Sequence, residues 1–281
     1  MSDPRRLLAS RQLRPKKSFG QNFLIVARYV DAIADACVGA ESDPLVVELG
    51  AGTGVLTAAL LARGAKVVAV ERDRDLIPVL EAEFAEAIAA GRLTLLEADA
   101  KTIELDAIVR AHGRTRCVLA GNLPYQLTGP LLERATQSRD LVTRVVFLVQ
   151  KEVAERLAAG PRTKVYGALT VFVAAQFAVK LVVHVPSAAF FPAPDVDSAV
   201  VAFTPRDPAI TDETPTFQQV VRAAFAQRRK TLRNAWGKVA TPERILAAAE
   251  AAGVSLDQRG EELSPETFAE VARVLSLSAP V

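Results

Sequence analysis

The chain has 281 residues, half of them hydrophobic and 23% charged, with a formal net charge of +2. This composition excludes a chain that is disordered throughout, and the length allows one large domain or one large and one small domain. With two Cys, two His and no apolar N-terminal segment, the sequence predicts no disulfide framework, no metal site and no signal peptide, and we expect a cytoplasmic protein that does not enter a membrane.

The charge is unevenly distributed along the chain. Residues 1–20 carry six basic side chains and one acid, and residues 222–238 carry six basic side chains and no acid. The rest of the chain is therefore acidic, with a net charge of −9. Two basic segments on an acidic body are typical of proteins that bind a phosphate backbone, although a frayed terminus and a solvated helix face would produce the same counts.

Short hydrophobic runs alternate with helical patterns through the first two thirds of the chain. Strands are predicted at 45–49, 67–70, 93–96, 117–120 and 145–149, and helices between them at 56–63 and 76–90. Continuous hydrophobic runs are typical of buried parallel strands, so the pattern predicts an α/β fold with an open, Rossmann-like sheet and helices on both faces. Two later strands are predicted at 181–185 and 198–203.

A glycine-rich turn follows the first of these strands, in the sequence Glu48-Leu49-Gly50-Ala51-Gly52-Thr53-Gly54. Glycine allows the chain to turn tightly and lets a ligand approach the backbone. Glu71 ends the next strand, where a carboxylate can accept hydrogen bonds from both ribose hydroxyls of an adenosine-containing ligand. The pattern therefore predicts a nucleotide-like cofactor.

The spacing of the glycines indicates which cofactor. The dinucleotide fingerprint requires glycine where this chain has Val55, and no catalytic His or Lys pair is evident, which disfavours an NAD-dependent dehydrogenase. Glu-x-Gly-x-Gly-x-Gly instead resembles the first motif of S-adenosylmethionine (SAM) methyltransferases. That resemblance implies that the loop approaches SAM, that Glu71 holds the ribose, and that Asp99 accepts from the adenine amine. A lone Asp at this place is also typical of a helix N-cap, and one residue can serve both roles.

The segment after the fourth strand reads Asn122-Leu123-Pro124-Tyr125. The exocyclic amine of adenine is a poor nucleophile, because its lone pair is delocalised into the ring. An Asn side-chain oxygen and a neighbouring backbone carbonyl that both accept from the amine would favour a pyramidal nitrogen and direct its lone pair toward a methyl donor. Pro124 stiffens the turn, and Tyr125 can stack on a splayed-out base. We therefore predict methylation of an amine, with positioning and electrostatics as the main sources of rate.

The composition changes at residues 204–215, a Pro-rich and acidic stretch that is typical of a linker. After it the sequence predicts helices alone, one running from Pro215 to about Trp236 and two others that begin at Pro242 and Pro265, each after a capping Thr or Ser. We predict two domains: a catalytic domain with a basic N-terminal arm, residues 1–205, and a small all-helical RNA-binding domain, residues 206–281.

Six sequence blocks together resemble the ribosomal RNA adenine dimethyltransferases, and within them the bacterial small-subunit branch. They are 17–24, the glycine loop, 122–125, 149–156, 190–194 and 228–234. One departure is Ala51, where the family loop often carries Pro; this is a mild change in a turn dominated by backbone geometry.

The resemblance implies roles for individual residues. The contacts to SAM would come from Asn22, Leu24, Gly50, Gly52, Glu71, Asp99 and Asn122. Asn122, Leu123, Pro124 and Tyr125 would hold the target adenine, with Phe191, or alternatively Phe190, stacked on its other face. Ribosomal RNA would be bound by the N-terminal arm together with Arg228, Arg229, Lys230 and Arg233.

The resemblance also implies a reaction. It is the transfer of two methyl groups from SAM to the N6 amine of each of two adjacent adenosines near the 3′ end of 16S ribosomal RNA. The partner would be an immature small ribosomal subunit, the enzyme would act as a monomer without a metal, and the reaction would contribute to ribosome biogenesis.

Two other interpretations remain at this point. The first is the sister enzyme that dimethylates one adenine of large-subunit ribosomal RNA and confers macrolide resistance. The second is a ribosome-assembly or transcription factor that kept the fold and the RNA contacts but lost the chemistry. The intact Glu71, Asp99 and 122–125 disfavour loss of chemistry, but they are compatible with a binding role beside the enzymatic one.

Overall fold

A computed structural model of the chain describes residues 3–122, 128–227 and 229–277. By its internal contacts the chain divides into two compact units. The first comprises Met1–Ala154 and Lys180–Thr204, and the second comprises Glu155–Val179 and Pro205–Val281. Residues 155–179, which the sequence analysis placed in the first domain, therefore pack with the C-terminal helices.

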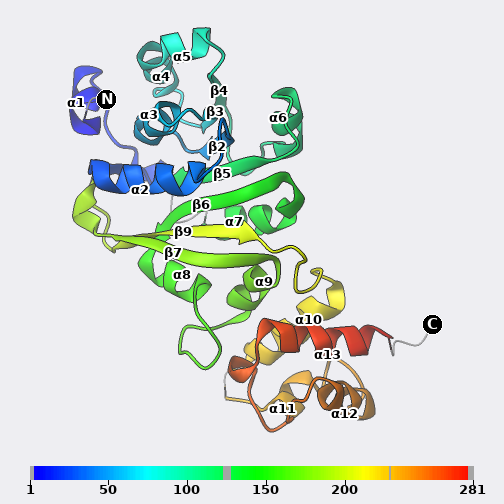
Figure 1. Ribbon diagram of the computed structural model, residues 1–281. Helices are drawn as coiled ribbons and strands as arrows, with labels where there is room; N and C mark the ends of the chain where they lie inside the picture. Colours follow the sequence, from blue (N-terminus) through cyan, green and yellow to red (C-terminus); the bar gives the residue numbers. More distant parts are fainter. Residues whose placement is uncertain (1–2, 123–127, 228, 278–281) are drawn as a thin grey trace. The chain divides into compact units, whose positions relative to one another are not determined.

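The first unit is built on a mixed sheet (Figure 1). Within the described residues it has seven strands in the spatial order β4-β3-β2-β5-β6-β9-β7. Their bounds are β2 Leu45–Leu49, β3 Lys66–Glu71, β4 Leu93–Glu97, β5 Cys117–Asn122, β6 Val142–Gln150, β7 Phe177–Val185 and β9 Ser198–Pro205. The strands from β4 to β6 pair in parallel, and β9 pairs antiparallel to β6. Every strand predicted from a hydrophobic run is present, and the Rossmann-like α/β fold is confirmed.

The first unit also contains helices, most of which connect its strands. They are α1 Pro4–Ser10, α2 Ala27–Val38, α3 Val55–Ala62, α4 Ile77–Glu83, α5 Ala85–Ala89, α6 Leu105–Ala111, α7 Thr128–Gln137 and α8 Lys151–Leu157, which ends in the second unit. The single helix predicted at 76–90 is two helices, because Phe84 leaves helical geometry at φ −117° and ψ 20°. Short 3-10 turns lie at Lys17–Phe19, Arg139–Leu141 and Ser187–Ala189.

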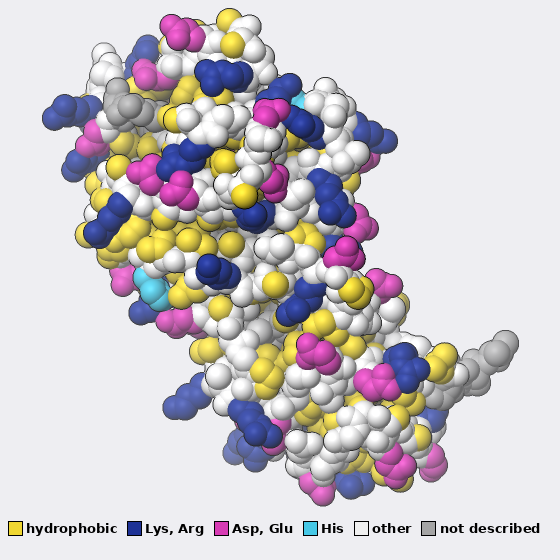
Figure 2. All heavy atoms as spheres, in the orientation of Figure 1, with side chains coloured by type: hydrophobic (Ala, Val, Ile, Leu, Met, Phe, Trp, Pro, Cys, Tyr) yellow, Lys and Arg dark blue, Asp and Glu magenta, His cyan; other side chains and the backbone are white. Residues whose placement is uncertain are grey.

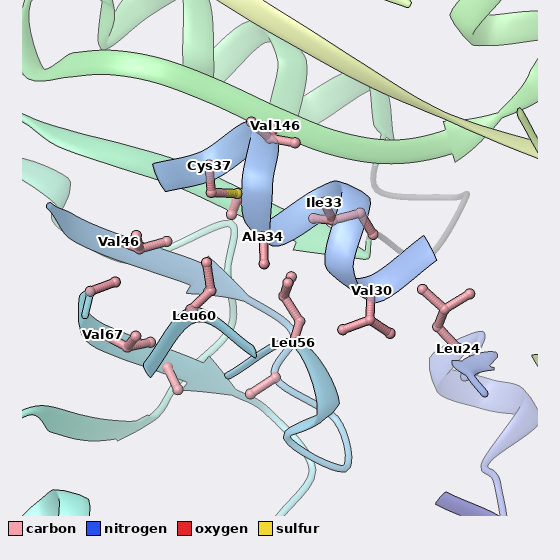
Figure 3. Packing of buried hydrophobic residues seen from close by; sticks show 14 of the residues in the cluster. Leu24, Val30, Ile33, Ala34, Cys37, Val46, Leu56, Leu60, Val67 and Val146 are labelled. Carbon is pink, nitrogen blue, oxygen red and sulfur yellow. The ribbon is translucent and has the colours of Figure 1, made fainter. Parts of the chain in front are cut away.

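Both faces of the central strands of the sheet are buried. On one face, Val46 and Val67 pack with α2 and α3 around Ile33 and Leu60, as Figure 3 shows. The side chains that alternate with them point to the opposite face and are equally buried, among them Val47, Val68, Leu119 and Phe147. Alternation along a strand sends successive side chains to opposite faces, so helices are required on both sides.

A second, two-stranded sheet ties distant segments together. β1, Phe23–Leu24, pairs antiparallel with β8, Phe190–Phe191, with Phe23 opposite Phe191. The N-terminal segment is thereby fixed to the segment that precedes the last strand.

The second unit is helical. Its helices are α9 Ala168–Gln176, α10 Pro215–Ala226, α11 Leu232–Trp236, α12 Pro242–Ala251 and α13 Pro265–Leu277, with a 3-10 turn at Gly260–Glu262. They share one hydrophobic core, whose largest buried side chain is Trp236. The predicted helix starts at Pro215, Pro242 and Pro265 are confirmed.

The predicted helix from Pro215 to Trp236 is wrong in its length. It ends at Ala226, and α11 is a separate helix. The N–H groups of Leu232 and Arg233 donate to the carbonyls of Gln258 and Leu256, and the Trp236 indole N–H donates to the carbonyl of Val220 at 3.0 Å. These long-range bonds turn α11 back onto α10, so the basic residues do not share one helix face.

Candidate functional site

A cavity lies where β2, β3 and β5 end. Its lining includes all residues that the sequence analysis predicted to contact SAM: Asn22, Leu24, Gly50, Gly52, Glu71, Asp99 and Asn122. They come from the N-terminal segment, from three strand ends and from the loop after β4. Parallel strands end at the same edge of a sheet, so residues far apart in sequence meet there. Their contacts to a cofactor remain a prediction.

The glycine loop needs glycine for two reasons. Gly50, Gly52 and Gly54 have φ values of 74°, 59° and 78°, in the left-handed region that other residues rarely adopt. A Cβ on Gly54 would also lie 2.5 Å from the ring of Phe84, and a Cβ on Gly52 would lie 3.1 Å from the ring of Phe23. Positive φ therefore favours glycine at all three positions, and at Gly52 and Gly54 the neighbouring rings also leave little or no room for a Cβ.

Three N–H groups of the loop are used for hydrogen bonds within the protein. The N–H groups of Gly50 and Ala51 donate to the carbonyl of Val70 at 2.8 and 3.1 Å, and the N–H of Gly52 donates to Glu71 Oε2 at 2.7 Å. A loop that binds pyrophosphate keeps such groups free for the phosphate oxygens. The N–H groups of Gly50, Ala51 and Gly52 are therefore not available to the oxygens of a pyrophosphate.

Glu71 is nearly buried, and its carboxylate is held in a fixed orientation. Besides Gly52, the N–H groups of Arg72 and Asp73 donate to its Oε1 at 2.8 and 2.7 Å. Burial raises the pKa of Glu71, and the three hydrogen bonds oppose that shift. The carboxylate is thus positioned as an acceptor at the end of β3, where the ribose of an adenosine would be held.

Asp99 lies two residues beyond β4, half-buried in the cavity wall. Its Oδ1 accepts from the N–H of Lys101 at 3.0 Å, and its Oδ2 lies 3.3 Å from the guanidinium of Arg72. It therefore stabilises a turn rather than the first turn of a helix. Asp99 also lines the cavity, and its predicted contact to the adenine amine remains a prediction.

The segment at residues 16–24, which we call the N-terminal strap, covers part of the cavity. It is fastened by Asp73, a buried carboxylate that pairs with the Lys16 ammonium and accepts from the Gln21 amide at 2.7 Å. Lys16 also lies 2.7 Å from Asp75. The strap is therefore held by charge-assisted hydrogen bonds, which are stronger than neutral ones.

Asn122 ends β5 and contacts the N-terminal strap. Its Nδ2 donates to the backbone carbonyl of Asn22 at 3.0 Å. This bond sets the orientation of the amide and leaves Oδ1 as an acceptor, which is the role that the sequence analysis predicted for it. The predicted partners Leu123, Pro124 and Tyr125 lie outside the described residues.

The two candidate clamp residues differ in their surroundings. Phe190 is 4% exposed and belongs to the core cluster of the first unit, whereas Phe191 is 36% exposed. A stacking side chain must be accessible to the base, so the exposure favours Phe191. Its role remains a prediction.

The predicted RNA-binding residues lie in the second unit. Arg229 and Lys230 are exposed between α10 and α11, and Arg233 is exposed on α11, 3.8 Å from Asp257. Arg228 lies outside the described residues.

The basic residues of the N-terminal segment belong to the first unit. Four of them are exposed and form no ion pair with the residues that the structure describes: Arg6, Arg11, Arg14 and Lys17. On the face drawn in Figure 2, basic and acidic side chains are interspersed.

Sequence reasoning missed three features of the cavity. Glu48 is buried in its wall, and the Thr53 hydroxyl is buried there with no hydrogen-bond partner among the described residues. The ring of Phe19 lies under the cations of Lys16 and Arg72, at 5.4 and 5.1 Å. Glu48 had a visible signal, a carboxylate inside an otherwise hydrophobic strand, but the other two depend on contacts between distant segments.

The residues of the cavity fit SAM. Carboxylates suit the ribose hydroxyls and a cationic ligand, Asp99 suits an adenine amine, and the unpartnered Thr53 hydroxyl indicates space for a polar ligand atom.

In the described part of the chain, no cluster of His, Cys, Asp and Glu could hold a metal ion. No helix there is both long enough and apolar enough to cross a bilayer.

The chain is similar to known proteins over nearly its whole length. A family model described as ribosomal RNA adenine dimethylase matches residues 12–277. The chain is 46% identical to a ribosomal RNA small subunit methyltransferase A from Anaeromyxobacter dehalogenans (strain 2CP-C), over 97% of each chain. It is 43% identical to one from Myxococcus xanthus (strain DK1622), over 100% of this chain and 98% of the relative.

Two solved structures share the fold. A dimethyladenosine transferase from Plasmodium falciparum superposes with a TM-score of 0.72 at 24% identity, over 89% of this chain and 95% of the other. The 23S rRNA methyltransferase ErmE superposes with a TM-score of 0.71 at 23% identity, over 91% of this chain and 100% of the other. Both likenesses extend over the sheet and the C-terminal helices.

Proposed function

The chain belongs to the ribosomal RNA adenine dimethylase family, and we propose that it transfers methyl groups from SAM to the N6 amines of two adjacent adenosines near the 3′ end of 16S ribosomal RNA. One observation carries the proposal: the amide of Asn122 lies at the cavity with its Nδ2 committed to Asn22 and its Oδ1 left to accept. The small-subunit enzymes at 43% and 46% identity support the choice of subunit.

The cavity residues would hold SAM in a defined orientation. Glu71 would accept from the ribose hydroxyls and Asp99 from the adenine amine, while the strap residues Asn22 and Leu24 cover the ligand. SAM, when bound, supplies an electrophilic methyl group on a sulfonium centre. The glycine loop lets that part of the ligand approach the ends of the strands without a Cβ in the way.

The role of Asn122 is to orient the nucleophile. Its Oδ1 accepts a hydrogen from the adenine amine, which favours a pyramidal nitrogen and directs the lone pair at the methyl group. No strong general base is needed, because the proton leaves after the nitrogen has become cationic. The rate then depends on in-line positioning and on electrostatics in a site shielded from water.

The target base would be held between two aromatic rings. Phe191 offers an exposed ring at the end of β8, and Tyr125 would stack on the opposite face. Phe191 is paired with Phe23 of the N-terminal strap in the two-stranded sheet. The residue proposed to stack on the base and the segment proposed to cover SAM are therefore joined by their backbones.

Both units would contribute to RNA binding. The exposed basic residues of the N-terminal segment and of residues 229–233 are suited to phosphate contacts, which position an RNA without reading its sequence. We propose an immature small subunit as the partner, a monomeric enzyme, the cytoplasm as its location, and a division of labour between a catalytic and an RNA-binding domain.

The large-subunit alternative has less support. The similarity to the 23S rRNA methyltransferase ErmE, at 23% identity, concerns the fold alone, whereas the relatives above 40% identity are small-subunit enzymes. A factor that binds RNA without chemistry is disfavoured by the intact acceptors Glu71, Asp99 and Asn122.

Methyl transfer to undermodified ribosomal subunits tests the proposal. Purified protein and radiolabelled SAM are incubated with small or large subunits from cells that lack these methylations, and the labelled bases are mapped. We expect label in two adjacent adenosines of 16S RNA alone. Label confined to large-subunit RNA would establish the sister activity, and RNA binding without any transfer would establish a binding factor.

A further inference from the structure

Glu48 is the most deeply buried carboxylate of the cavity wall. It lies one residue before the end of β2 and is 1% exposed. Its Oε2 accepts from the hydroxyl of Thr57, on α3, at 2.5 Å. Neither ribose nor adenine needs this group, since Glu71 and Asp99 occupy the positions suited to them. A buried carboxyl without a structural cation beside it requires an explanation.

The cavity as a whole favours a positive ligand. Three carboxyl groups line it, from Glu48, Glu71 and Asp99, and Arg72 is the one basic side chain among the described residues of the lining. Arg72 is committed to Asp99 and to the ring of Phe19. The N–H groups of Gly50, Ala51 and Gly52 in the glycine loop donate within the protein and are not available to an anion.

We propose that Glu48 is the counter-charge of the sulfonium centre of SAM, and that it makes the cavity prefer SAM to its uncharged thioether product, S-adenosylhomocysteine. The inference rests on the proposed function, since it assumes SAM as the ligand. The two molecules share every hydrogen-bonding group and differ by one methyl group and one positive charge. A site can discriminate between them strongly only by shape at the methyl group or by charge.

The protonation state of Glu48 then depends on the ligand. Burial, with a smaller contribution from the charge of Glu71 on β3, raises the pKa of Glu48 to about 8, and the Thr57 hydroxyl opposes this shift. On α2, Cys37 faces the same carboxyl as a neutral thiol, because burial raises its pKa far above the physiological range. At pH 7 the free protein therefore holds Glu48 mostly protonated, and a bound cation lowers its pKa and expels the proton.

Calorimetric titration of the purified protein with SAM and with S-adenosylhomocysteine tests this inference. Titrations in buffers of different ionisation enthalpy, from pH 6.5 to 8.5, measure both the affinity and the protons released. We expect a preference for SAM of about tenfold or more in the wild type, with close to one proton released per SAM at pH 7 and progressively fewer above pH 8. S-adenosylhomocysteine should release far fewer.

The variant Glu48→Gln keeps the shape and the bond from Thr57 but cannot ionise. We expect it to lose the preference for SAM and the associated proton release, while its affinity for S-adenosylhomocysteine changes little. The α-amino groups of the ligands titrate in the same range, so the difference between wild type and variant at each pH isolates Glu48. Glu83→Gln, an exposed carboxyl on α4, is the matched control and should behave as the wild type.

A second variant, Thr57→Val, tests the same inference in case Glu48→Gln does not fold. Thr57→Val removes the hydroxyl that stabilises the ionised carboxylate, so proton release on SAM binding should persist and shift to higher pH. Equal preference for the two ligands in the wild type, or an unchanged preference in Glu48→Gln, would overturn the inference while leaving SAM as the methyl donor. A wild type that binds neither ligand would overturn the proposed function as well.

Discussion

Asn122 and Asn22, a hundred positions apart in the sequence, are joined by a hydrogen bond of 3.0 Å from the side-chain amide of the first to the backbone carbonyl of the second. Because Asn22 belongs to the strap and Asn122 ends the central strand β5, the position of the strap and the orientation of the Asn122 amide are coupled. The bond uses the backbone of Asn22, so a side-chain substitution there leaves it in place.

Replacing Asn122 by Ala should lower the rate of methyl transfer by about 10² to 10³ fold and leave RNA binding nearly unchanged. The variant loses the acceptor that we propose orients the adenine amine, and the loss of one such preorganised group typically lowers a rate by about 10² to 10³ fold. Single-turnover methylation of undermodified small subunits measures the rate, and filter binding measures the affinity for RNA. A parallel loss of both would contradict the assigned role.

Replacing Asp73 by Asn should loosen the strap and weaken SAM binding by about tenfold or more. The substitution removes the buried charge that pairs with Lys16 and keeps the shape of the side chain. Equilibrium dialysis with SAM measures the effect. The control is Asp75→Asn, whose side chain is 55% exposed and which should matter much less because exposed ion pairs contribute little.

Phe190 and Phe191 form a matched pair of neighbours with opposite expectations. Phe190→Ala empties a core position and should lower the free energy of unfolding by about 3 to 5 kcal/mol. Phe191→Ala should change stability little and reduce methyl transfer, because the exposed ring is lost as a stacking surface for the base. Chemical unfolding measures the stability of each variant, and methylation assays measure its activity. If Phe190→Ala lowered methyl transfer without loss of stability while Phe191→Ala lowered stability, Phe190 would be the stacking residue.

Neutralising Arg229, Lys230 and Arg233 together should weaken RNA binding and flatten its salt dependence. Each lost phosphate contact should reduce the slope of log K against log salt by about 0.7 to 0.9. Affinities for small-subunit RNA at several salt concentrations provide the slope. Arg273→Ala, an exposed arginine of α13 that pairs with Glu270, is the control for a change of net charge. An unchanged slope in the triple variant would exclude this segment from the interface.

The stability of the ligand-free protein should depend on Glu48. Its pKa is about 8 in the folded chain and about 4.5 when unfolded, so the unfolded chain loses the proton first. The free energy of unfolding contributed by this group is therefore fully present below pH 4.5 and declines as pH rises to about 8. The loss is at most about 5 kcal/mol. Urea unfolding of the wild type and of Glu48→Gln from pH 4.5 to 8.5 should converge at low pH and diverge in favour of the variant at high pH.

The strands and the central part of the cavity were predictable because their determinants are local. A run such as 45–49 needs burial on both faces, and a turn with three positive φ values needs glycine whatever surrounds it. The spacing from this turn to Glu71 follows from the length of one strand-helix-strand unit. These features depend on neighbours in sequence, so they can be recognised without coordinates.

The features that escaped prediction depend on long-range contacts. The fastening of the strap joins Lys16 to Asp73, and the break after Ala226 is made by carbonyls near residue 257. Nothing in the composition of residues 222–238 opposes a helix, so propensity alone predicted one long element. Glu48 was visible in the sequence as a carboxylate in a hydrophobic strand, but its contact with Thr57 depends on how α3 covers β2.

The three loop glycines meet different neighbours. A side chain at position 54 would collide with Phe84 of the fold's interior, one at position 52 would press on Phe23 of the strap, and one at position 50 would meet only the carbonyl of Asn122, at 3.9 Å. The same residue type, glycine, is thus required for three reasons: packing in the interior at position 54, contact with the strap at position 52, and backbone conformation at position 50. A sequence pattern that counts all three glycines as evidence of ligand binding counts too many. Packing against the buried ring of Phe84 is by itself enough to require glycine at position 54.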